Sequence, residues 1–353
     1  MCSAIERTVL VTGAAGVIGQ ALLPVLNDHR VIALQHTTAG EALPHVTWIR
    51  GDISRPRLGL ARDDFAALAG QVDAVVHAAA VTDLAADPAL IRQVNVTGTE
   101  TVLNFAERAG ATVYFVDSAF AARAETCTAV TGIGCAAGRD AYLASKIASA
   151  DLVRRSGLEH VILRLSLLMG DSRSGRIARR QGMHSVLGAY CLGDLPFLPL
   201  EAAALIDMVP QDMLVEAIRR LVDGHDGELS TREYWLTVGP AAITVGRMFE
   251  TAREVMAGLG RRLDSPRYFP VETMLRLVRP AFFDILKPRA RRRLDDLLAM
   301  ASMFSGSEPF PTSLGNPPLQ GLEITEELSR AVIARTVRRY WAPAHPQERE
   351  VVA

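Results

Sequence analysis

Tyr142 and Lys146 are the two residues of this sequence whose types and spacing point most directly to chemistry. A separation of four residues places two side chains on the same face of a helix. An ammonium beside a phenol stabilises the phenolate, so the pair predicts a lowered pKa for Tyr142 and proton transfer near neutral pH. Ser118 ends an expected strand upstream of the tyrosine. The three residues together predict proton transfer coupled to hydride transfer by a cofactor.

A glycine-rich loop near the N-terminus predicts where that cofactor binds. Gly13, Gly16 and Gly19 follow a short β-branched run and open an expected helix. The first permits a tight turn, the second lets backbone amides approach a pyrophosphate, and the third lets the helix pack on the strand. The helix N-terminus adds a positive potential for the phosphates. The loop residues predicted to bind the cofactor are Thr12, Gly13, Ala15, Gly16, Val17, Ile18 and Gly19.

The residue type at the end of the second expected strand indicates whether a site of this kind prefers NADH or NADPH. Sites that prefer NAD place a carboxylate there, which binds the adenosine ribose. This sequence has Gln35 and His36 instead, and no acid that would repel a 2′-phosphate, so we expect NADPH rather than NADH. Asp52 and Ile53 follow the third expected strand and are predicted to contact the adenine. A simple turn residue is the alternative for Asp52.

A parallel sheet is needed to bring these residues together, and the hydrophobic pattern predicts one. Short β-branched runs alternate with longer helical segments, which implies right-handed crossovers and a sheet covered on both faces. We therefore expect an α/β fold with a doubly wound parallel sheet (Rossmann) over residues 1–168. Pro24 should bend or end the first helix. Strands are expected at residues 8–12, 30–34, 46–50, 72–77, 112–116 and 160–165, with helices at 16–28, at 88–109 and around Tyr142.

Residues 169–353 are expected to form a smaller, mostly helical substrate-binding region. Strands at 205–210 and 233–239 should place the segment 205–240 back in the sheet or in a small neighbouring one. The helical part is expected at residues 245–259, at 272–286 with a kink at Pro280, and at 325–340 after a loop at 305–318.

Composition excludes several classes of function. The chain of 353 residues has a formal net charge of −1, so no global field favours nucleic acid. No apolar run reaches the roughly 18 residues of a membrane-spanning helix. The first residues lead directly into a strand without space for a signal peptide, so we expect a cytoplasmic protein. The four cysteines and eight histidines lack metal-ligand spacing, so we expect no metal site. A catalytic thiol at Cys127 or Cys135 is a minor alternative.

Residues 8–245 resemble the extended short-chain dehydrogenase/reductase family. Besides the glycine loop, the matching pieces are Gly51-Asp52, His77-Ala-Ala-Ala80, Asn95 in its Val-Asn-Val-Thr-Gly context, and Ser118 with Tyr142 and Lys146. In this family the tyrosine is the general acid/base, the lysine binds the nicotinamide ribose and lowers the tyrosine pKa, and the serine polarises the substrate carbonyl. The resemblance also implies cofactor contacts from Ala78, Ala79, Ala80, Asn95, Tyr142, Lys146 and Leu165.

Later segments are similar to the thioester reductase and fatty acyl-CoA reductase branch of that family. Residues 162–175 resemble a stretch that reads R-P-x-x-x-x-G-D-S-R-T-G there, and residues 206–212 resemble a V-D-x-V-P-V-D segment. Leu165 replaces the usual proline, which alters the stretch against the nicotinamide. Residues 121–138 are expected to be a loop in the substrate wall. The substrate contacts implied by the resemblance are Thr82, Ala119, Phe120 and Arg173.

A basic segment, residues 287–293, follows an apolar stretch and has three interpretations. It is a solvated basic turn after a core helix, or a rim that receives the phosphates of coenzyme A or an acidic carrier protein. The third interpretation is a helix on a membrane surface, which would be a peripheral contact.

The sequence thus predicts an NADPH-dependent reductase that passes hydride to the carbonyl of an acyl thioester, an aldehyde or a bulky ketone. The substrate would be a small molecule or an acyl group linked to a carrier, with Ser118, Tyr142 and Lys146 as the catalytic set. The alternatives are an NAD-dependent sugar-nucleotide epimerase/dehydratase, a hydroxysteroid-type dehydrogenase and a non-catalytic NADP-sensing protein. The sequence does not decide whether the chain forms a homodimer.

Overall fold

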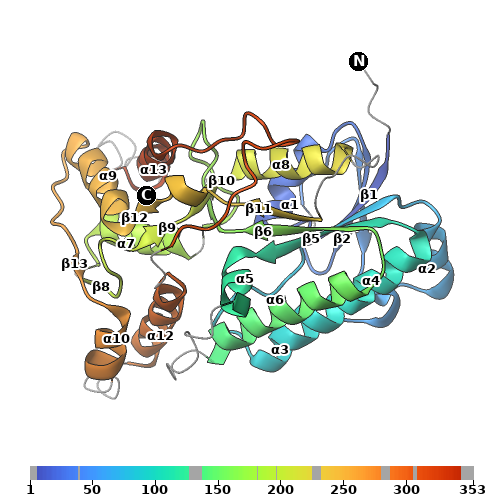
Figure 1. Ribbon diagram of the computed structural model, residues 1–353, viewed down its shortest axis with the longest axis horizontal. Helices are drawn as coiled ribbons and strands as arrows, with labels where there is room; N and C mark the ends of the chain where they lie inside the picture. Colours follow the sequence, from blue (N-terminus) through green and yellow to red (C-terminus); the bar gives the residue numbers. More distant parts are fainter. Residues whose placement is uncertain are drawn as a thin grey trace, which may run out of the picture.

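The centre of the molecule is a parallel β-sheet with helices on both faces (Figure 1). The computed structural model describes residues 6–38, 40–126, 137–180, 182–195, 197–224, 232–279, 287–304 and 308–342. Within them, seven strands pair in parallel in the order β11-β6-β5-β4-β1-β2-β3. These strands are β1 (Thr8–Thr12), β2 (Arg30–Gln35), β3 (Val46–Arg50), β4 (Ala74–His77), β5 (Thr112–Ser118), β6 (His160–Leu165) and β11 (Glu233–Leu236). The predicted doubly wound α/β fold is confirmed.

Different helices cover the two faces because successive strand residues point to opposite sides of the sheet. The helices are α1 (Val17–Leu22), α2 (Arg62–Ala69), α3 (Pro88–Arg92), α4 (Gly98–Ala109), α5 (Ala119–Thr126), α6 (Ala137–Arg155) and α8 (Gln211–Asp223). Val9 and Val11 of β1 pack in the core beneath α1 and α8. Leu10 packs on the other face, in the core beneath α2, α4 and α6 (Figure 1).

Two predicted helices depart from regular α-geometry. The first ends early, because Pro24 cannot continue the α-helical hydrogen bonds, and α1 passes into a 3₁₀ turn, Leu23–Val25. The helix predicted at residues 88–109 is α3 and α4 joined by a π-helical segment, Gln93–Thr97. Single π turns of this kind are frequent at functional sites, and this one contains Asn95.

The remaining elements form a second, mostly helical region with its own hydrophobic core, at the left of Figure 1. Val337 of α13 shares this core with Phe249 of α9 and Leu187 of α7. The helices are α7 (Met183–Leu192), α9 (Val245–Gly258), α10 (Val271–Thr273), α12 (Pro288–Met303) and α13 (Glu326–Trp341). The paired short strands are β7 (Leu167–Met169) with β10 (Met208–Pro210), β8 (Phe197–Leu198) with β13 (Arg267–Tyr268), and β9 (Leu205–Ile206) with β12 (Ile243–Thr244).

The segment 205–240, expected either to rejoin the main sheet or to form a small neighbouring one, contributes strands to both. β11 rejoins the main sheet beside β6, whereas β9 and β10 lie in two-stranded sheets. The predicted last helix is α13, and Thr325 caps it by accepting a hydrogen bond from the backbone N–H of Leu328. No helix in the described ranges is long and apolar enough to cross a membrane.

Three sequence predictions about the connecting segments need correction or completion. Residues 119–126 form α5 rather than a loop, and residues 127–136, with Cys127 and Cys135, lie outside the described residues. Residues 288–293 open α12 and are not a basic turn. The helix predicted at 272–286 begins as α10 and a π segment, and its remainder from Pro280 lies outside the described residues.

Candidate active site

The predicted catalytic and nucleotide residues meet at the carboxyl edge of the sheet. Thr12, His77 and Ser118 end β1, β4 and β5, which are neighbours in the sheet. The chain leaves β1 toward β2 on one side and reaches β4 and β5 on the other, so the strand order reverses here. Open α/β sheets bind their ligands in the crevice at such a reversal.

Ser118, Tyr142 and Lys146 come together at this edge. Ser118 is buried at the end of β5, and its side chain hydrogen-bonds the phenol of Tyr142 on α6. One turn further along α6, Lys146 is buried, and its Nζ donates a 2.7 Å hydrogen bond to the carbonyl oxygen of Val116. The spacing of four therefore places both side chains of α6 over the last residues of β5.

The pKa of Tyr142 is raised to about 12, which contradicts the lowered value expected from the sequence. Burial is the largest cause, and the negative charge of Asp117 adds to it, while the hydrogen bond from Ser118 acts in the opposite direction. The ammonium of Lys146 is directed to β5, where it lies 3.5 Å from Asp117 Oδ1. The phenol is therefore protonated at neutral pH, as a proton donor must be, although the raised pKa makes it a weaker acid.

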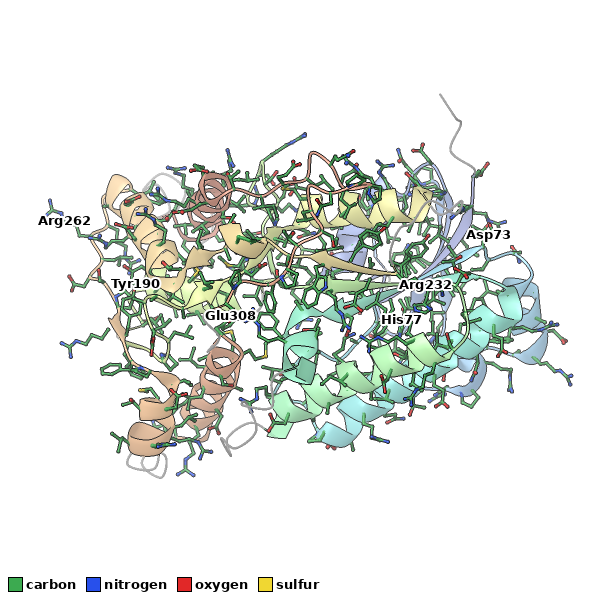
Figure 2. The ribbon with its side chains drawn as sticks, viewed as in Figure 1. Asp73, His77, Tyr190, Arg232, Arg262 and Glu308 are labelled. Atoms are coloured by element: carbon green, nitrogen blue, oxygen red, sulfur yellow. The ribbon has the colours of Figure 1, made fainter. Side chains whose placement is uncertain are left out.

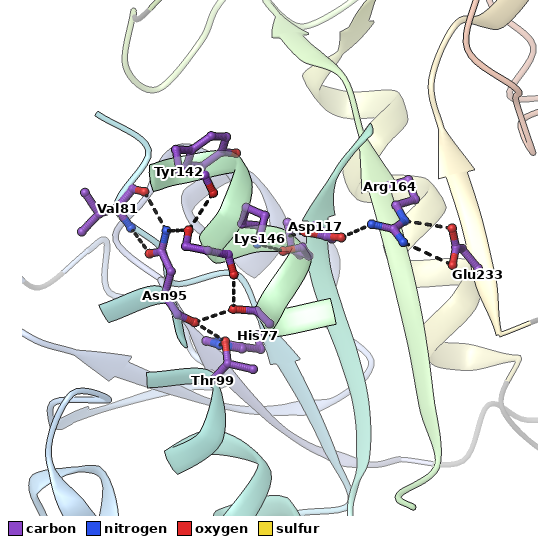
Figure 3. A network of polar contacts seen from close by, with 12 residues as sticks. His77, Val81, Asn95, Thr99, Asp117, Tyr142, Lys146, Arg164 and Glu233 are labelled. Carbon is purple, nitrogen blue, oxygen red and sulfur yellow. Dashed lines mark hydrogen bonds and ion pairs between the residues drawn. The ribbon is translucent and has the colours of Figure 1, made fainter. Parts of the chain in front are cut away.

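A buried row of charges continues from Lys146 across three strands (Figure 3). Arg164 on β6 donates from Nη1 to Asp117 Oδ2 and from Nε to Glu233 Oε1 on β11, at 2.8 Å. Burial lowers the pKa of Lys146. The negative charge of Asp117 offsets only part of this, so the pKa stays below its usual value. The row balances two cations against two carboxylates, as buried charges require.

Sequence reasoning missed Asp117, Arg164 and Glu233 as members of the site. A signal was present, because strands buried on both faces normally read as unbroken hydrophobic runs. Asp117 and Arg164 interrupt two such runs, and they are register partners in the sheet. Charged residues that interrupt neighbouring buried strands predict a cross-strand ion pair.

The nucleotide loop is packed tightly against the segment that follows β4. Gly13 has φ +70°, and a Cβ there would lie 2.6 Å from the backbone nitrogen of Ala79. A Cβ on Gly19 would lie 2.4 Å from the Gly13 carbonyl oxygen. Thr12 Oγ1 accepts from the Ala79 backbone N–H at 3.3 Å and hydrogen-bonds His77 Nδ1 at 2.7 Å. These contacts leave no space for larger residues in the loop.

His77 and Asn95 hold the loop and α6 together. Burial is the larger cause that lowers the pKa of His77 to about 3, so its neutral ring links Thr12 to Thr99. Asn95 Nδ2 donates to the Val81 carbonyl oxygen at 3.1 Å and to Ser145 Oγ at 2.9 Å (Figure 3). Asn95 thereby connects the segment after β4 to the helix of Tyr142. Its predicted contact with the cofactor stays a prediction.

The adenosine end of the predicted cofactor site lies after β2 and β3. Gln35 Oε1 is buried and has no hydrogen-bond partner among the described residues. Asp52 accepts from the backbone N–H of Ser54 at 2.9 Å, as a turn residue does, and lies 3.2 Å from Arg55 Nε and 3.7 Å from His36 Nε2. Burial works to raise the pKa of Asp52, but these partners outweigh it and lower that pKa.

These features fit a nicotinamide dinucleotide. The N-terminus of α1 begins at the glycine loop, and no side chain caps it and no acid lies in its first turn. Its N–H groups are the type of donor that binds a diphosphate. The unpartnered oxygen of Gln35 lies at the strand end where an adenosine ribose binds in this fold.

The predicted substrate residues separate into buried and exposed ones. Ala119 and Phe120 are buried directly after Ser118, and Phe120 packs edge-on against Phe304 and Phe310 with ring centroids 5.3 and 5.2 Å apart. Thr82 and Arg173 are exposed. A small, open pocket with room for about one water molecule adjoins Phe120, and its walls include Arg123, Leu205, Asp207, Phe304, Glu308 and Phe310.

The described ranges give little support for catalysis by a metal ion or by a cysteine thiol. They contain no group of three or more His, Cys, Asp or Glu side chains arranged to hold a metal ion. Cys191 is buried in α7, and burial raises the pKa of its thiol to about 12. A thiol with so high a pKa is a poor nucleophile at neutral pH.

Comparison with known proteins identifies similar chains. A family model of NAD-binding domains, described as male sterility protein, matches residues 26–218. Glycine betaine reductase ATRR of Emericella nidulans is 33% identical over 146 residues, which cover 33% of this chain and 12% of the relative. The chain thus spans a small part of that relative's length.

Two solved structures share the fold over nearly the whole chain. The terminal R domain of the myxalamid PKS-NRPS biosynthetic pathway has a TM-score of 0.69 at 24% identity, covering 97% of this chain and 94% of that domain. The enzyme WbmH of Bordetella bronchiseptica, in complex with NAD⁺, has a TM-score of 0.64 at 19% identity, covering 96% and 100%.

Proposed function

Because this chain belongs to the NAD-binding family described as male sterility protein, we propose that it reduces acyl thioesters with NADPH. Membership confirms the resemblance to extended short-chain dehydrogenases/reductases of the thioester reductase type, and with it an oxidoreductase that uses a nicotinamide cofactor. The observation that carries the proposed reaction is the hydrogen bond between Ser118 and a protonated Tyr142 at the carboxyl edge of the sheet.

In the proposed mechanism, the bound cofactor supplies a hydride to the substrate carbonyl carbon. The hydroxyls of Ser118 and Tyr142 donate hydrogen bonds to the carbonyl oxygen and stabilise the negative charge that develops on it. Tyr142 is the proposed proton donor, and it holds its proton at neutral pH. Loss of the thiol from the reduced carbon leaves an aldehyde. Lys146 lies beside Tyr142 on α6 and is proposed to bind the nicotinamide ribose.

The proposed substrate is an acyl group on a thiol carrier. We assign binding of the cofactor and binding of this substrate to different regions of the chain. Residues 1–168 would bind the cofactor, with residues 205–240 completing the sheet, and the rest of residues 169–353 would bind the substrate. The aromatic rings of Phe120, Phe304 and Phe310, which pack together directly after Ser118, are proposed to contact an apolar acyl chain. The guanidinium of Arg123 lies 3.6 Å over the ring of Phe310, and the carboxylates of Asp207 and Glu308 line the same pocket.

We propose NADPH rather than NADH, and Gln35→Asp tests that preference. A carboxylate at the end of β2 binds the ribose hydroxyls of NADH and repels a 2′-phosphate. The ratio of kcat/KM for NADPH to that for NADH should fall by about tenfold or more. Gln71→Asp, at an exposed position before β4, is the matched control and should leave the ratio unchanged. An unchanged ratio in Gln35→Asp would refute the role of Gln35.

The proposed reaction is tested by following NADPH oxidation with a medium-chain acyl-CoA, the matching aldehyde and a bulky ketone. Oxidation with the thioester supports the proposal. Oxidation with only the aldehyde or the ketone keeps the mechanism and rejects the thioester as substrate. If the protein binds NADPH but does not oxidise it with the acyl-CoA, the aldehyde or the ketone, the proposed reductase activity is contradicted. A sugar nucleotide would then be the next substrate to try.

A further inference from the structure

Seven exposed arginines gather on one surface of the second region. Four lie in residues 170–180, the segment that follows β7, and three lie in the last two turns of α13. None of their side chains forms an ion pair with a carboxylate in the part of the chain that the structure describes. We call this surface the arginine face, and its members are Arg173, Arg176, Arg179, Arg180, Arg335, Arg338 and Arg339.

Direct contacts hold the two segments of the arginine face together. Arg335 Nη1 donates a 2.7 Å hydrogen bond to the carbonyl oxygen of Ser172. The hydroxyl of Tyr340 accepts from the backbone N–H of Ile177 at 3.0 Å and donates to its carbonyl oxygen at 3.1 Å. Gly175 has φ +67°, and a Cβ there would lie 2.6 Å from the backbone carbonyl carbon of Arg335. The arginines therefore belong to one surface with a tightly packed backbone.

The arginine face is more basic than its own elements require. Arg338 and Arg339 stabilise α13, because cations in the last turn of a helix interact favourably with its dipole. The four arginines of residues 170–180 lie outside any helix. Asp171, the only acid of that segment, is used within its turn, where Oδ1 accepts from the backbone N–H and the hydroxyl of Ser174, each at 2.6 Å. The face is thus a local positive surface on a chain of formal net charge −1.

An acidic protein surface fits the arginine face better than a bilayer or a nucleic acid does. A membrane-surface helix needs apolar side chains beside its basic ones, and a nucleic-acid-binding domain is basic overall, which this chain is not. Seven guanidinium groups also exceed what the few phosphates of one coenzyme can neutralise. A protein carboxylate pairs with a guanidinium through two parallel hydrogen bonds. The large apolar side chains that are exposed among the described residues lie outside the face, at Leu90, Leu192, Leu259, Phe269 and Leu277.

The arginine face begins near the proposed reaction site. Leu165, the last residue of β6, is the register partner of Ser118. The segment with four arginines begins at Gly170, five residues later, and five residues span at most about 18 Å. A long, flexible thiol arm can span this distance from a carrier that is bound at the face.

We propose that the arginine face docks an acidic carrier protein, whose thiol arm delivers the acyl group to Ser118 and Tyr142. This proposal rests on the proposed reductase function and identifies the thiol carrier as a protein. Attraction between surfaces of opposite charge speeds their encounter and fixes their relative orientation. The face therefore contributes to capture of the substrate and not to hydride transfer.

Arg176→Glu/Arg338→Glu tests the proposal, because both side chains are exposed and neither forms a hydrogen bond or ion pair with another described residue. The same medium-chain acyl group is offered on a bacterial acyl carrier protein of net negative charge, on coenzyme A and on N-acetylcysteamine, an uncharged thiol. With the carrier protein, kcat/KM should fall by about tenfold or more, since like charges then face each other. With N-acetylcysteamine it should stay within about twofold of wild type, which also shows that the variant is folded.

Arg108→Glu/Arg155→Glu is the matched control. It reverses the same number of charges at exposed positions near the ends of α4 and α6, which lead into β5 and β6 at the amino edge of the sheet, away from α13 (Figure 1). It should leave kcat/KM for the carrier protein within about twofold of wild type. An equal fall in this control, or an unchanged value in the face variant, would overturn the proposal. So would an equal fall with the acyl-CoA, because the face would then bind the phosphates of the coenzyme.

Direct binding separates this proposal from the proposed function, since fluorescence anisotropy of the labelled carrier protein reads docking without turnover. The face variant should bind about tenfold or more weakly than wild type. Binding by wild type should weaken as ionic strength rises from about 0.05 to about 0.5 M. Wild-type protein that does not bind the carrier overturns the docking proposal, whereas binding without reduction of any thioester contradicts the reductase function alone. Vesicles with phosphatidylserine and a DNA duplex are measured in parallel, and binding of either in preference to the carrier protein would also overturn the docking proposal.

Discussion

Tyr142→Phe should lower the kcat of NADPH-dependent reduction by about 10²–10⁴-fold, the usual contribution of a positioned general acid. The variant loses the hydroxyl that is hydrogen-bonded to Ser118 and keeps the ring that packs against the hydrophobic core of the second region. Binding of NADPH, measured by fluorescence titration, should change little, because the proposed role of the hydroxyl is proton donation. The loss should therefore appear in kcat rather than in cofactor affinity.

Tyr190→Phe is the matched control for this prediction. The hydroxyl of Tyr190 donates to the carbonyl oxygen of Asp264 at 2.9 Å, and Figure 2 shows Tyr190 in the second region, far from His77 in the sheet. Its removal should leave kcat within about twofold of wild type, since surface and remote hydroxyls contribute little to turnover. Equal activity in Tyr142→Phe and wild type would remove Tyr142 from the mechanism.

Arg164→Met should destabilise the protein by about 3–5 kcal/mol, as expected when one partner of a buried ion pair is removed. Arg164 is 1% exposed and pairs with both Asp117 and Glu233, so its loss leaves Lys146 as the remaining cationic partner of Asp117 among the described residues. Methionine fills a similar volume, which limits the contribution of a cavity. The measurement is the free energy of unfolding from denaturant titration.

Arg155→Met, one helix position beyond Arg154, provides the comparison for an exposed pair. Arg155 Nη2 lies 3.0 Å from Asp151 Oδ2 with its side chain 72% exposed. Exposed pairs of this kind contribute at most about 1 kcal/mol. If Arg164→Met destabilised the protein no more than Arg155→Met, the charge row under α6 would not be a structural element of the fold.

The fold could be predicted from the sequence wherever local signals were strong. β1, β3 and β6 begin and end where their short β-branched runs begin and end, and glycines, Gly13 and Gly51, directly follow the first two. Pro24 ended α1 as its missing N–H requires. The π segment around Asn95 was missed, since nothing in the periodicity of residues 88–109 distinguishes one extra residue in a helical turn.

The meeting of the three proposed catalytic residues could be predicted from the sequence, whereas the charged residues beside them and the electrostatics of the site could not. Ser118, Tyr142 and Lys146 do come together, because a spacing of four on a helix and a strand end are local features. The pKa of Tyr142 was predicted in the wrong direction. Burial and the charge of Asp117 decide it, and both follow from the packing of α6 on β5, which spacing along the chain does not contain.

The central claim is that hydride passes from the nicotinamide to a thioester carbonyl held at Ser118 and Tyr142. The most direct measurement uses NADPH deuterated at the transferable position and an acyl-CoA, with the aldehyde product trapped as an oxime and analysed by mass spectrometry. We predict one deuterium on the former carbonyl carbon in the wild type, and almost no labelled product in Tyr142→Phe. Unlabelled product, or equal labelled product from the wild type and the variant, would contradict the proposed mechanism.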